Sequence, residues 1–476
     1  MCKLSFYGNC DPGTEGEEYC IFHRPGKAGE EAEEFWKKFF ERFKPEEEEL
    51  EIDEEKIRRF IFKEDVDCSG YVFPMPPEGT GISMELFRYS IFEGRAIFRG
   101  ATFPEVDFRG ASFSGEAIFS ETKFKGDADF SDVEFTGRAS FREASFSGWA
   151  IFFRTKFKGD ANFSGATFER SVSYTRTEFY GSADFSKARF PILNEGGGEI
   201  SEGLLSYASF RRVYFKNPER VVFDSMRGKV KISFMNTDVS RVVFRNCSFD
   251  FLFDEYLFKK REVLERELRD IESKGPSEGS EEIKRLREIL EYELSDLTLD
   301  NVLSVIRMLR ENFDYYMRYE ESGRLFVKEM DLKRDHLLEG VEKLTDKIVK
   351  RVEWFAYSLY KWTCLYGESI SRPIFLALAI IITFAIPRAF SPSTIGAWES
   401  FTASLTGWDG DLFALAEGVK ALLSPFIEGI RESLLDFMQL GSDLGWLNLS
   451  ERLLSAMDFA TLYISLHRKL ERRIRH

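Results

Sequence analysis

Large aromatic residues recur at intervals of five or six between residues 92 and 190, and most positions between them are polar residues or glycine. From residue 98 onward, Ala, Val or Thr stands two positions before each aromatic residue. A fixed register of one large and one small residue predicts a repetitive structure in which both series point inward. The aromatic positions are Phe92, Phe98, Phe103, Phe108, Phe113, Phe119, Phe124, Phe130, Phe135, Phe141, Phe146, Phe152, Phe157, Phe163, Phe168, Tyr174, Phe179, Phe185 and Phe190.

Neither a continuous helix nor a straight strand fits this repeat. Ten glycines lie between residues 90 and 190, and Gly126, Gly137, Gly148 and Gly159 are evenly spaced, one for every two aromatic repeats. Each glycine costs about 1 kcal/mol relative to Ala in a helix, so a helical form would lose about 10 kcal/mol. In a straight strand, gaps of five would place successive Phe on opposite faces. The pattern therefore predicts a β-solenoid that turns at each repeat, with Gly, Ser and Asp at the corners.

Segments such as ANFSGATF (161–168) and ADFSKARF (183–190) resemble the pentapeptide-repeat family. This resemblance implies a right-handed, four-sided β-helix. The register resumes after three glycines at 196–198, with Phe210, Phe215, Phe223, Phe234, Phe244 and Phe249. The predicted solenoid core comprises Phe98, Phe103, Phe108, Phe113, Phe119, Phe124, Phe130, Phe135, Phe141, Phe146, Phe152, Phe157, Phe163 and Phe168.

Some members of this family mimic DNA to protect topoisomerases, but the charge of this repeat argues against that function. Residues 91–190 carry 14 acids and 14 bases, whereas a duplex mimic needs a strong negative stripe. The balanced charge fits a rigid spacer, or a protein-docking surface on the β-helix faces, better than it fits a DNA mimic.

The whole chain of 476 residues has a formal net charge of −15, and residues 30–56 alone hold 13 acids against 5 bases. This balance disfavours nucleic acid as a partner, because phosphate neutralisation needs clustered Lys and Arg. The length suggests several domains.

Three cysteines and a histidine stand close together at the start of the chain: Cys2, Cys10, Cys20 and His23. Three thiolates and one imidazole suit a tetrahedral zinc ion, and a segment too small to build its own core needs such a ligand. We therefore predict structural zinc in a knuckle; the alternative is unpaired thiols on a loose tail. Six cysteines in so long a chain are too few for a disulfide scaffold, and residues 1–30 contain no apolar run of a signal peptide.

Charged helices are predicted after the repeat, in a hairpin over 252–300 interrupted by GPSEGS (275–280), and again over 305–334. YGESISRP (366–373) and the apolar IFLALAIIITFAI (374–386) follow. This order resembles pentapeptide-repeat proteins that carry a two-helix ion-channel module of the potassium-channel superfamily, and it implies an α-helical membrane module.

Both candidate membrane spans are short. Only 15 residues separate Arg372 from Arg388, fewer than the roughly 20 that cross a bilayer, and Leu453–His467 contains Asp458. The alternative for the second segment is a buried amphipathic helix. Five bases in residues 468–475, against two bases and eight acids in 389–450, predict a cell-membrane protein with both termini in the cytoplasm.

The loop between these candidate spans contains SFTASLTGWDGD (400–411), which resembles a degenerate potassium-channel selectivity filter. The filter-like residues are Thr406, Gly407, Trp408, Gly410 and Asp411. Asp409 interrupts the motif, so the resemblance does not imply potassium selectivity.

No catalytic motif is present, so we expect a non-enzymatic protein. The predicted domains are a zinc knuckle (1–28), an acidic linker or helix (29–60), the β-helix (61–251), a helical stalk (252–345) and a membrane module (346–476). The leading hypothesis is a membrane-tethered homo-oligomer whose β-helix is a docking or regulatory scaffold on a channel-like module. The alternatives are a working tetrameric ion channel and a soluble interaction scaffold.

Overall fold

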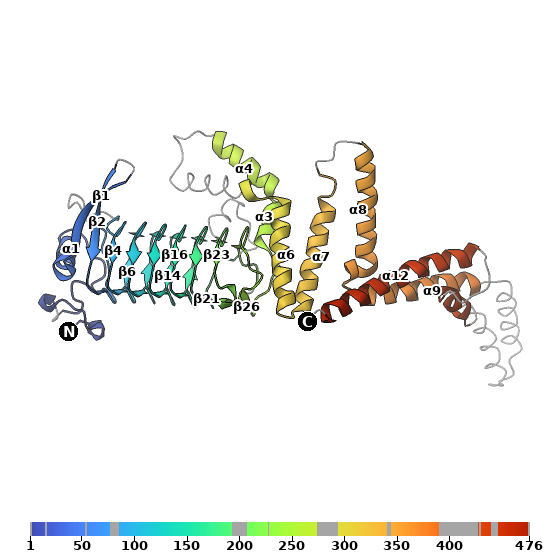
Figure 1. The fold of residues 1–476 in the computed structure, drawn as a ribbon, viewed down its shortest axis with the longest axis horizontal. Helices are drawn as coiled ribbons and strands as arrows, with labels where there is room; N and C mark the ends of the chain where they lie inside the picture. The colour runs from blue at the N-terminus through green and yellow to red at the C-terminus, as the bar shows by residue number, and fades with distance from the viewer. Residues whose placement is uncertain are drawn as a thin grey trace, which may run out of the picture. The chain divides into compact units, whose positions relative to one another are not determined.

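The computed structural model describes residues 2–14, 17–52, 55–76, 85–192, 207–226, 228–273, 294–339, 344–389, 427, 430–438 and 446–474. These residues form two compact units, Met1–Leu325 and Phe326–His476. The first unit holds the β-helix with its end caps, and the second is helical (Figure 1).

The β-helix has about six turns, and its sides are four sheets of short strands that pair in parallel. One side contains β4 (Ile91–Phe92), β8 (Ser112–Phe113), β12 (Glu134–Phe135), β16 (Lys156–Phe157), β20 (Glu178–Phe179) and β23 (Tyr214–Phe215). The next contains β3 (Val66–Asp67), β5 (Ala96–Ile97), β9 (Ala117–Ile118), β13 (Ala139–Ser140), β17 (Ala161–Asn162), β21 (Ala183–Ser186), β24 (Val221–Asp224) and β26 (Val243–Arg245). The third contains β6 (Thr102–Phe103), β10 (Lys123–Phe124), β14 (Ser145–Phe146) and β18 (Thr167–Phe168). The fourth contains β7 (Val106–Asp107), β11 (Ala128–Asp129), β15 (Ala150–Ile151), β19 (Val172–Ser173), β22 (Ala208–Ser209) and β25 (Ile232–Ser233).

Phenylalanine rings fill the interior of the β-helix in register. Phe124 pairs with Phe146 of the next coil, and their rings stack at 4.6 Å. This distance is close to the roughly 4.8 Å between neighbouring strands, so strand pairing itself stacks the rings. All fourteen predicted core Phe are at most 3% exposed. Where the small residue is threonine, its hydroxyl donates to a backbone carbonyl of the previous coil, as Thr155 does to Phe130 at 2.7 Å.

The evenly spaced glycines lie where two coils come too close for a side chain. A Cβ on Gly148 would stand 2.4 Å from the carbonyl carbon of Gly126, and Gly159 is placed in the same way against Gly137. Because one coil contains four aromatic repeats and these glycines recur with every second repeat, they form two columns along the β-helix.

Different elements close the two ends of the solenoid. At the N-terminal end, α1 (Glu30–Phe43) buries Phe35, Trp36 and Phe39 against the first coil, where Phe35 lies 5.5 Å from Phe73. At the C-terminal end stand α3 (Phe253–Lys259), α4 (Arg261–Ser273), α6 (Leu299–Tyr315) and the start of α7 (Tyr319–Asp335). The 3-10 turn η3 (Pro218–Arg220) connects β23 to β24 within the β-helix. The buried Asn312 of α6 donates to the carbonyls of Val239 and Val242 at 2.8 and 2.6 Å. These bonds satisfy acceptors of the last coil that no further strand can reach.

The acidic segment expected as a linker or helix over 29–60 contains α1 and then an antiparallel hairpin of β1 (Glu46–Ile52) and β2 (Glu55–Phe62). In this hairpin, five Glu of β1 lie across from a strand containing Lys56, Arg58 and Arg59. Only Ile61 and Phe62 of β2 pair with β4 of the β-helix, so the rest of the hairpin projects beyond it (Figure 1).

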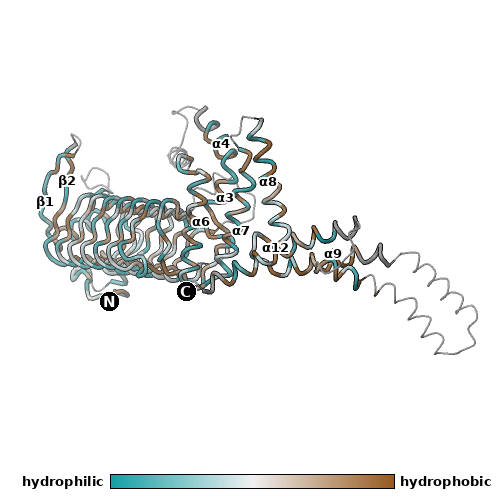
Figure 2. Tube along the Cα trace, turned by 45° about the vertical axis from the view of Figure 1, so that its right-hand side comes forward, coloured by the Kyte–Doolittle hydropathy of each residue, from teal (hydrophilic) through white to brown (hydrophobic). Residues whose placement is uncertain are grey.

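The second unit consists mainly of α8 (Leu344–Cys364), the 3-10 turn η4 (Leu365–Gly367), α9 (Ser371–Ala389) and α12 (Trp446–Ile474). α12 packs along α9, and hydrophobic residues recur along α8 and α9 (Figure 2). Within the described part of the chain, no single helix has both the length and the apolarity to cross a membrane. By length and composition one pair bent by 118° passes that test, Thr345–Gly367 with Ser371–Phe384. The five filter-like residues, 406–408, 410 and 411, lie outside the described residues.

Candidate metal centre

Cys2, Cys10, Cys20 and His23 converge at the N-terminus, with their ligand atoms all within 4.8 Å of one another. The Nδ1 atom of His23 lies 3.0 Å from Cys20 Sγ, 3.5 Å from Cys2 Sγ and 3.7 Å from Cys10 Sγ. Tetrahedral zinc places neighbouring N and S ligands roughly 3.5 Å apart. Cys10 is half-buried, whereas the other three side chains are buried. This Cys3His cluster can therefore hold a metal ion.

Tight turns bring together cysteines that are far apart in the sequence. The turn η1 (Ser5–Tyr7) follows Cys2 and ends at Gly8 with φ 75°, and η2 (Pro12–Thr14) follows Cys10. The N–H of His23 donates to the Cys20 carbonyl at 3.0 Å, which closes the turn that places both side chains on one side.

A backbone carbonyl of the β-helix orients the histidine. His23 Nε2 lies 3.2 Å from the carbonyl oxygen of Ser69, and this contact requires Nε2 to carry the proton. Nδ1 is then unprotonated and directs its lone pair at the three sulfur atoms. Hydrogen bonds of this kind fix the tautomer of metal-binding histidines and strengthen them as ligands.

Asn9 fastens the same turn to the first coil. Its side-chain Nδ2 donates to the Ser69 carbonyl at 2.9 Å. The backbone carbonyl of Asn9 accepts from Arg42 Nη1 at 2.9 Å and from the Tyr71 hydroxyl at 3.3 Å. The ring of Phe22 stacks on Tyr71 at 4.5 Å. The cluster is thus joined to the coil that it covers.

Tyr7 lies against one glycine corner in each of the first two coils. A Cβ on Gly70 would stand 2.4 Å from the Tyr7 ring, and one on Gly100 would stand 2.6 Å from its hydroxyl. Both glycines have positive φ, so they serve the turn and the contact together.

The thiols of the site keep their protons as long as no cation is bound. Burial, together with the neighbouring thiols of Cys2 and Cys20, raises the pKa of Cys10 to about 12. The nearby Lys27 supplies little positive charge, because burial lowers its pKa to about 7. A divalent ion can hold all three thiols as thiolates, and four donors leave no open position for a substrate.

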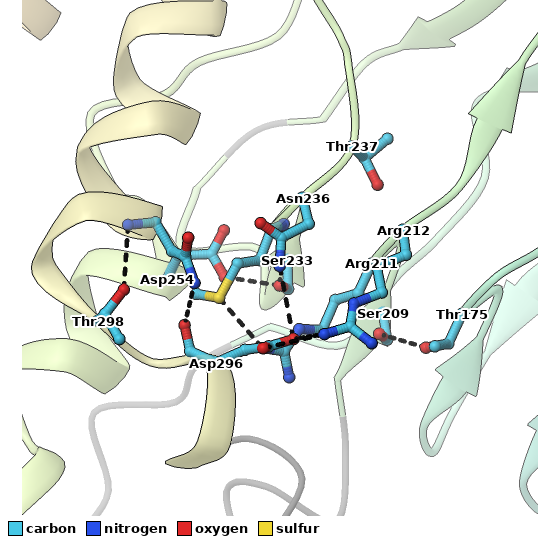
Figure 3. A network of polar contacts seen from close by, with 12 residues as sticks. Thr175, Ser209, Arg211, Arg212, Ser233, Asn236, Thr237, Asp254, Asp296 and Thr298 are labelled. Carbon is cyan, nitrogen blue, oxygen red and sulfur yellow. Dashed lines mark hydrogen bonds and ion pairs between the residues drawn. The ribbon is translucent and has the colours of Figure 1, made fainter.

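A second polar cluster joins the helices to the last coils (Figure 3). Asp296 accepts from Arg212 Nη2 at 2.8 and 3.0 Å and from Asn236 Nδ2 at 3.4 Å. Asp254 accepts from the hydroxyl of Ser233 at 2.6 Å. Just after Asp296, Thr298 caps α6 through a hydrogen bond from the N–H of Asn301. These contacts fix where α6 begins, and their role is to position the cap.

The four metal-ligand candidates could be named from the sequence, whereas Asn9, Ser69 and the Asp296 cluster were missed. Asn9 and Ser69 are 60 residues apart and Arg212 and Asp296 are 84 apart, and no spacing rule connects such positions.

The comparisons with known proteins bear on the β-helix. The family model of pentapeptide repeats (9 copies) matches residues 108–156, 119–167 and 152–191. Neither the curated proteins nor the solved structures gave a match. The matched residues are those whose Phe stacks form the centre of the solenoid.

Proposed function

We propose that this protein is a non-enzymatic scaffold whose C-terminal unit tethers it to the cell membrane. Its β-helix, stabilised at the N-terminal end by a zinc ion, binds partner proteins. The observation that carries the proposal is the inverted polarity of α12. Glu451, Ser455, Asp458 and Ser465 of this helix are buried, at most 2% exposed, whereas Leu453, Met457, Tyr463 and Leu470 are 50–66% exposed.

A helix of a water-soluble protein places its apolar stripe inward. The buried positions of α12 recur at intervals of three, four and seven, so they form one stripe, and that stripe is polar. The Ser433 hydroxyl lies within hydrogen-bond distance of Glu451 and of the Ile381 carbonyl in α9, and it can donate its single proton to one of the two. Small and polar residues at the seam with apolar residues outside are typical of helices packed in lipid.

α9 also carries an exposed apolar face. Ile374, Phe375, Leu378 and Ile382 are 48–69% exposed. An apolar surface this extensive on a described unit marks a membrane or protein interaction site. The basic tail over 468–475 then fits the cytoplasmic side, together with the N-terminus.

Fractionation of the full chain with and without detergent tests the membrane tether. We expect the chain in the membrane fraction, released by detergent and retained in high salt. Leu453→Glu combined with Met457→Glu should move it toward the soluble fraction, because both charges would face lipid. The matched control is Ile192→Glu, which changes an exposed apolar residue of the β-helix. Recovery of the whole unmodified chain without detergent would overturn the tether.

Recordings in planar bilayers separate a tether from a channel. We expect no selective unitary current, because Asp409 interrupts the filter-like motif. A current lost in Gly407→Ala or Gly410→Ala would instead show a pore, since those carbonyls need the backbone freedom of glycine.

Zinc is proposed as the ion of the Cys3His cluster, in a structural role. Metal analysis of the full chain should find one equivalent, and Cys20→Ala should lose it because three ligands no longer complete the tetrahedron. Cys247→Ala is the control, since this buried cysteine lies at the other end of the β-helix. Full zinc retention in the Cys20→Ala protein would refute the ligand set.

A further inference from the structure

The β1–β2 hairpin leaves the outer edge of β1 unpaired. β1 is the terminal strand of its sheet, and among the described residues only β2 pairs with it, over seven residue pairs from Glu46↔Ile61 to Ile52↔Glu55. Alternate residues of an edge strand direct N–H and C=O groups outward, where another strand can bind them. A projecting two-stranded hairpin is also only marginally stable by itself, so a third strand would stabilise it.

Charge determines which strand this edge can accept. Glu46 to Glu49 each have one basic partner on the inner side of β1, and the four ion pairs are 2.6 to 3.5 Å long. Both members of most of these pairs are largely exposed, so the carboxylates remain open to a second cation on the outer side. Glu51 is exposed and forms no ion pair with any residue the structure describes.

A second copy of β1 is a poor partner, because pairing would place glutamate opposite glutamate. Like charges on directly opposed strands are destabilising, whereas opposite charges contribute roughly 0.2–1 kcal/mol for each pair. The edge thus discourages self-association while favouring an extended segment rich in Lys or Arg.

We propose that β1 is a docking edge that binds a basic, extended segment of a partner protein as a third strand of the hairpin. The inference rests on the scaffold function proposed above and names one site and the chemistry of its partner. Backbone hydrogen bonds supply the affinity, and alternate side chains of the added strand supply the selectivity.

The test uses the full chain and a labelled peptide, KVKVKTK with blocked ends. Fluorescence anisotropy measures binding at fixed ionic strength, and amide hydrogen exchange locates it. We expect slower exchange in residues 46–52 on peptide addition. The same peptide N-methylated at three consecutive central amides keeps every charge but cannot pair there. We expect about tenfold weaker binding, since one or two hydrogen bonds of roughly 1 kcal/mol are lost and the methyl groups block close approach of the strands.

Protein variants test the charge requirement. Glu51→Lys should weaken binding about threefold without affecting the fold, since a surface charge pair contributes up to roughly 1 kcal/mol. Glu169→Lys, an exposed glutamate of the β-helix, is the matched control and should bind like the unmodified chain.

Three results would overturn the docking edge. They are equal affinity for the N-methylated peptide, equal affinity for the acidic peptide EVEVETE, and exchange protection that lies outside residues 46–52. Any of them would leave the membrane proposal intact, because fractionation does not depend on β1.

Discussion

Replacing Phe130 with Ala tests whether the stacked rings hold the β-helix together. The Phe130 side chain has no exposed surface. Its ring stacks between Phe108 and Phe152, at 5.1 and 5.0 Å, and meets Phe119 and Phe141 edge-on at 5.4 and 5.3 Å. Phe124 and Phe135 lie at 5.9 and 6.5 Å, so the substitution removes the centre of a seven-ring cluster.

The magnitude follows from burial and ring contacts. Burying a Phe side chain contributes about 2–3 kcal/mol, and each aromatic pair adds roughly 0.5–1.5 kcal/mol beyond burial. β11, which directly precedes Phe130, pairs with β15 in one neighbouring coil and with β7 in the other, so these coils cannot collapse into the cavity. We expect a loss of about 4 kcal/mol, within the range of about 3–5 kcal/mol for Phe→Ala in cores.

Amide hydrogen exchange on the full chain is the suitable assay, because it reports the opening free energy of individual coils. Residues 106–152 should exchange faster in Phe130→Ala, while coils farther away change less. Lys125→Ala is the control; its exposed side chain should contribute within about 0.5 kcal/mol. Equal effects of the two substitutions would refute the inward stack of Phe.

Three further predictions concern the packing, the cap and the surface charge. Gly148→Ala should destabilise the β-helix by at least about 1–3 kcal/mol in denaturant titrations, because its Cβ would meet the Gly126 backbone at 2.4 Å. A free energy of unfolding equal to that of Ser147→Ala would contradict that contact. Asn312→Ala should speed exchange in the last coil and cost roughly 1–3 kcal/mol for each carbonyl left unsatisfied, and unchanged exchange there would argue against α6 as the cap. Burial and the neighbouring Asp107 raise the pKa of Asp129. The folded chain therefore binds this proton more tightly than the unfolded chain, and stability falls as pH rises from just below 4. Asp129→Asn keeps the acceptor for the Ser131 N–H and should remove that part of the pH profile of stability; an unchanged profile would contradict the raised pKa.

The fold of the repeat could be predicted from the sequence because a constant spacing of large and small residues determines which side chains point inward. Phe and Ala in a constant register are compatible with only one inward-facing geometry, and the family match over 108–191 and the four parallel sheets agree with it. The metal-ligand candidates were also recognisable, because Cys and His have few other roles in so short and polar a segment.

The features that could not be predicted from the sequence depend on contacts between residues far apart in the chain, which no local pattern encodes. The β1–β2 hairpin was hidden in a run of acids, because the basic residues that lie across from these glutamates stand in the next strand, as Arg58 does opposite Glu49. In the sequence, Asp458 counted against a membrane span over 453–467, and the sequence does not show that its side chain is buried in the structure. In both cases a tertiary partner determined the outcome over local preference.

The constant register between coils also limits how the β-helix can change in length. One added coil would move the C-terminal cap about 4.8 Å along the axis without turning it, since each strand would still pair with its own column. An insertion half a coil long would keep every Phe inside but rotate all later coils by half a turn. The sheet that holds β12 would then continue into the sheet that holds β14, and any surface spread over several coils would be divided between opposite sides of the molecule. Docking surfaces on this solenoid can therefore be lengthened only in whole coils.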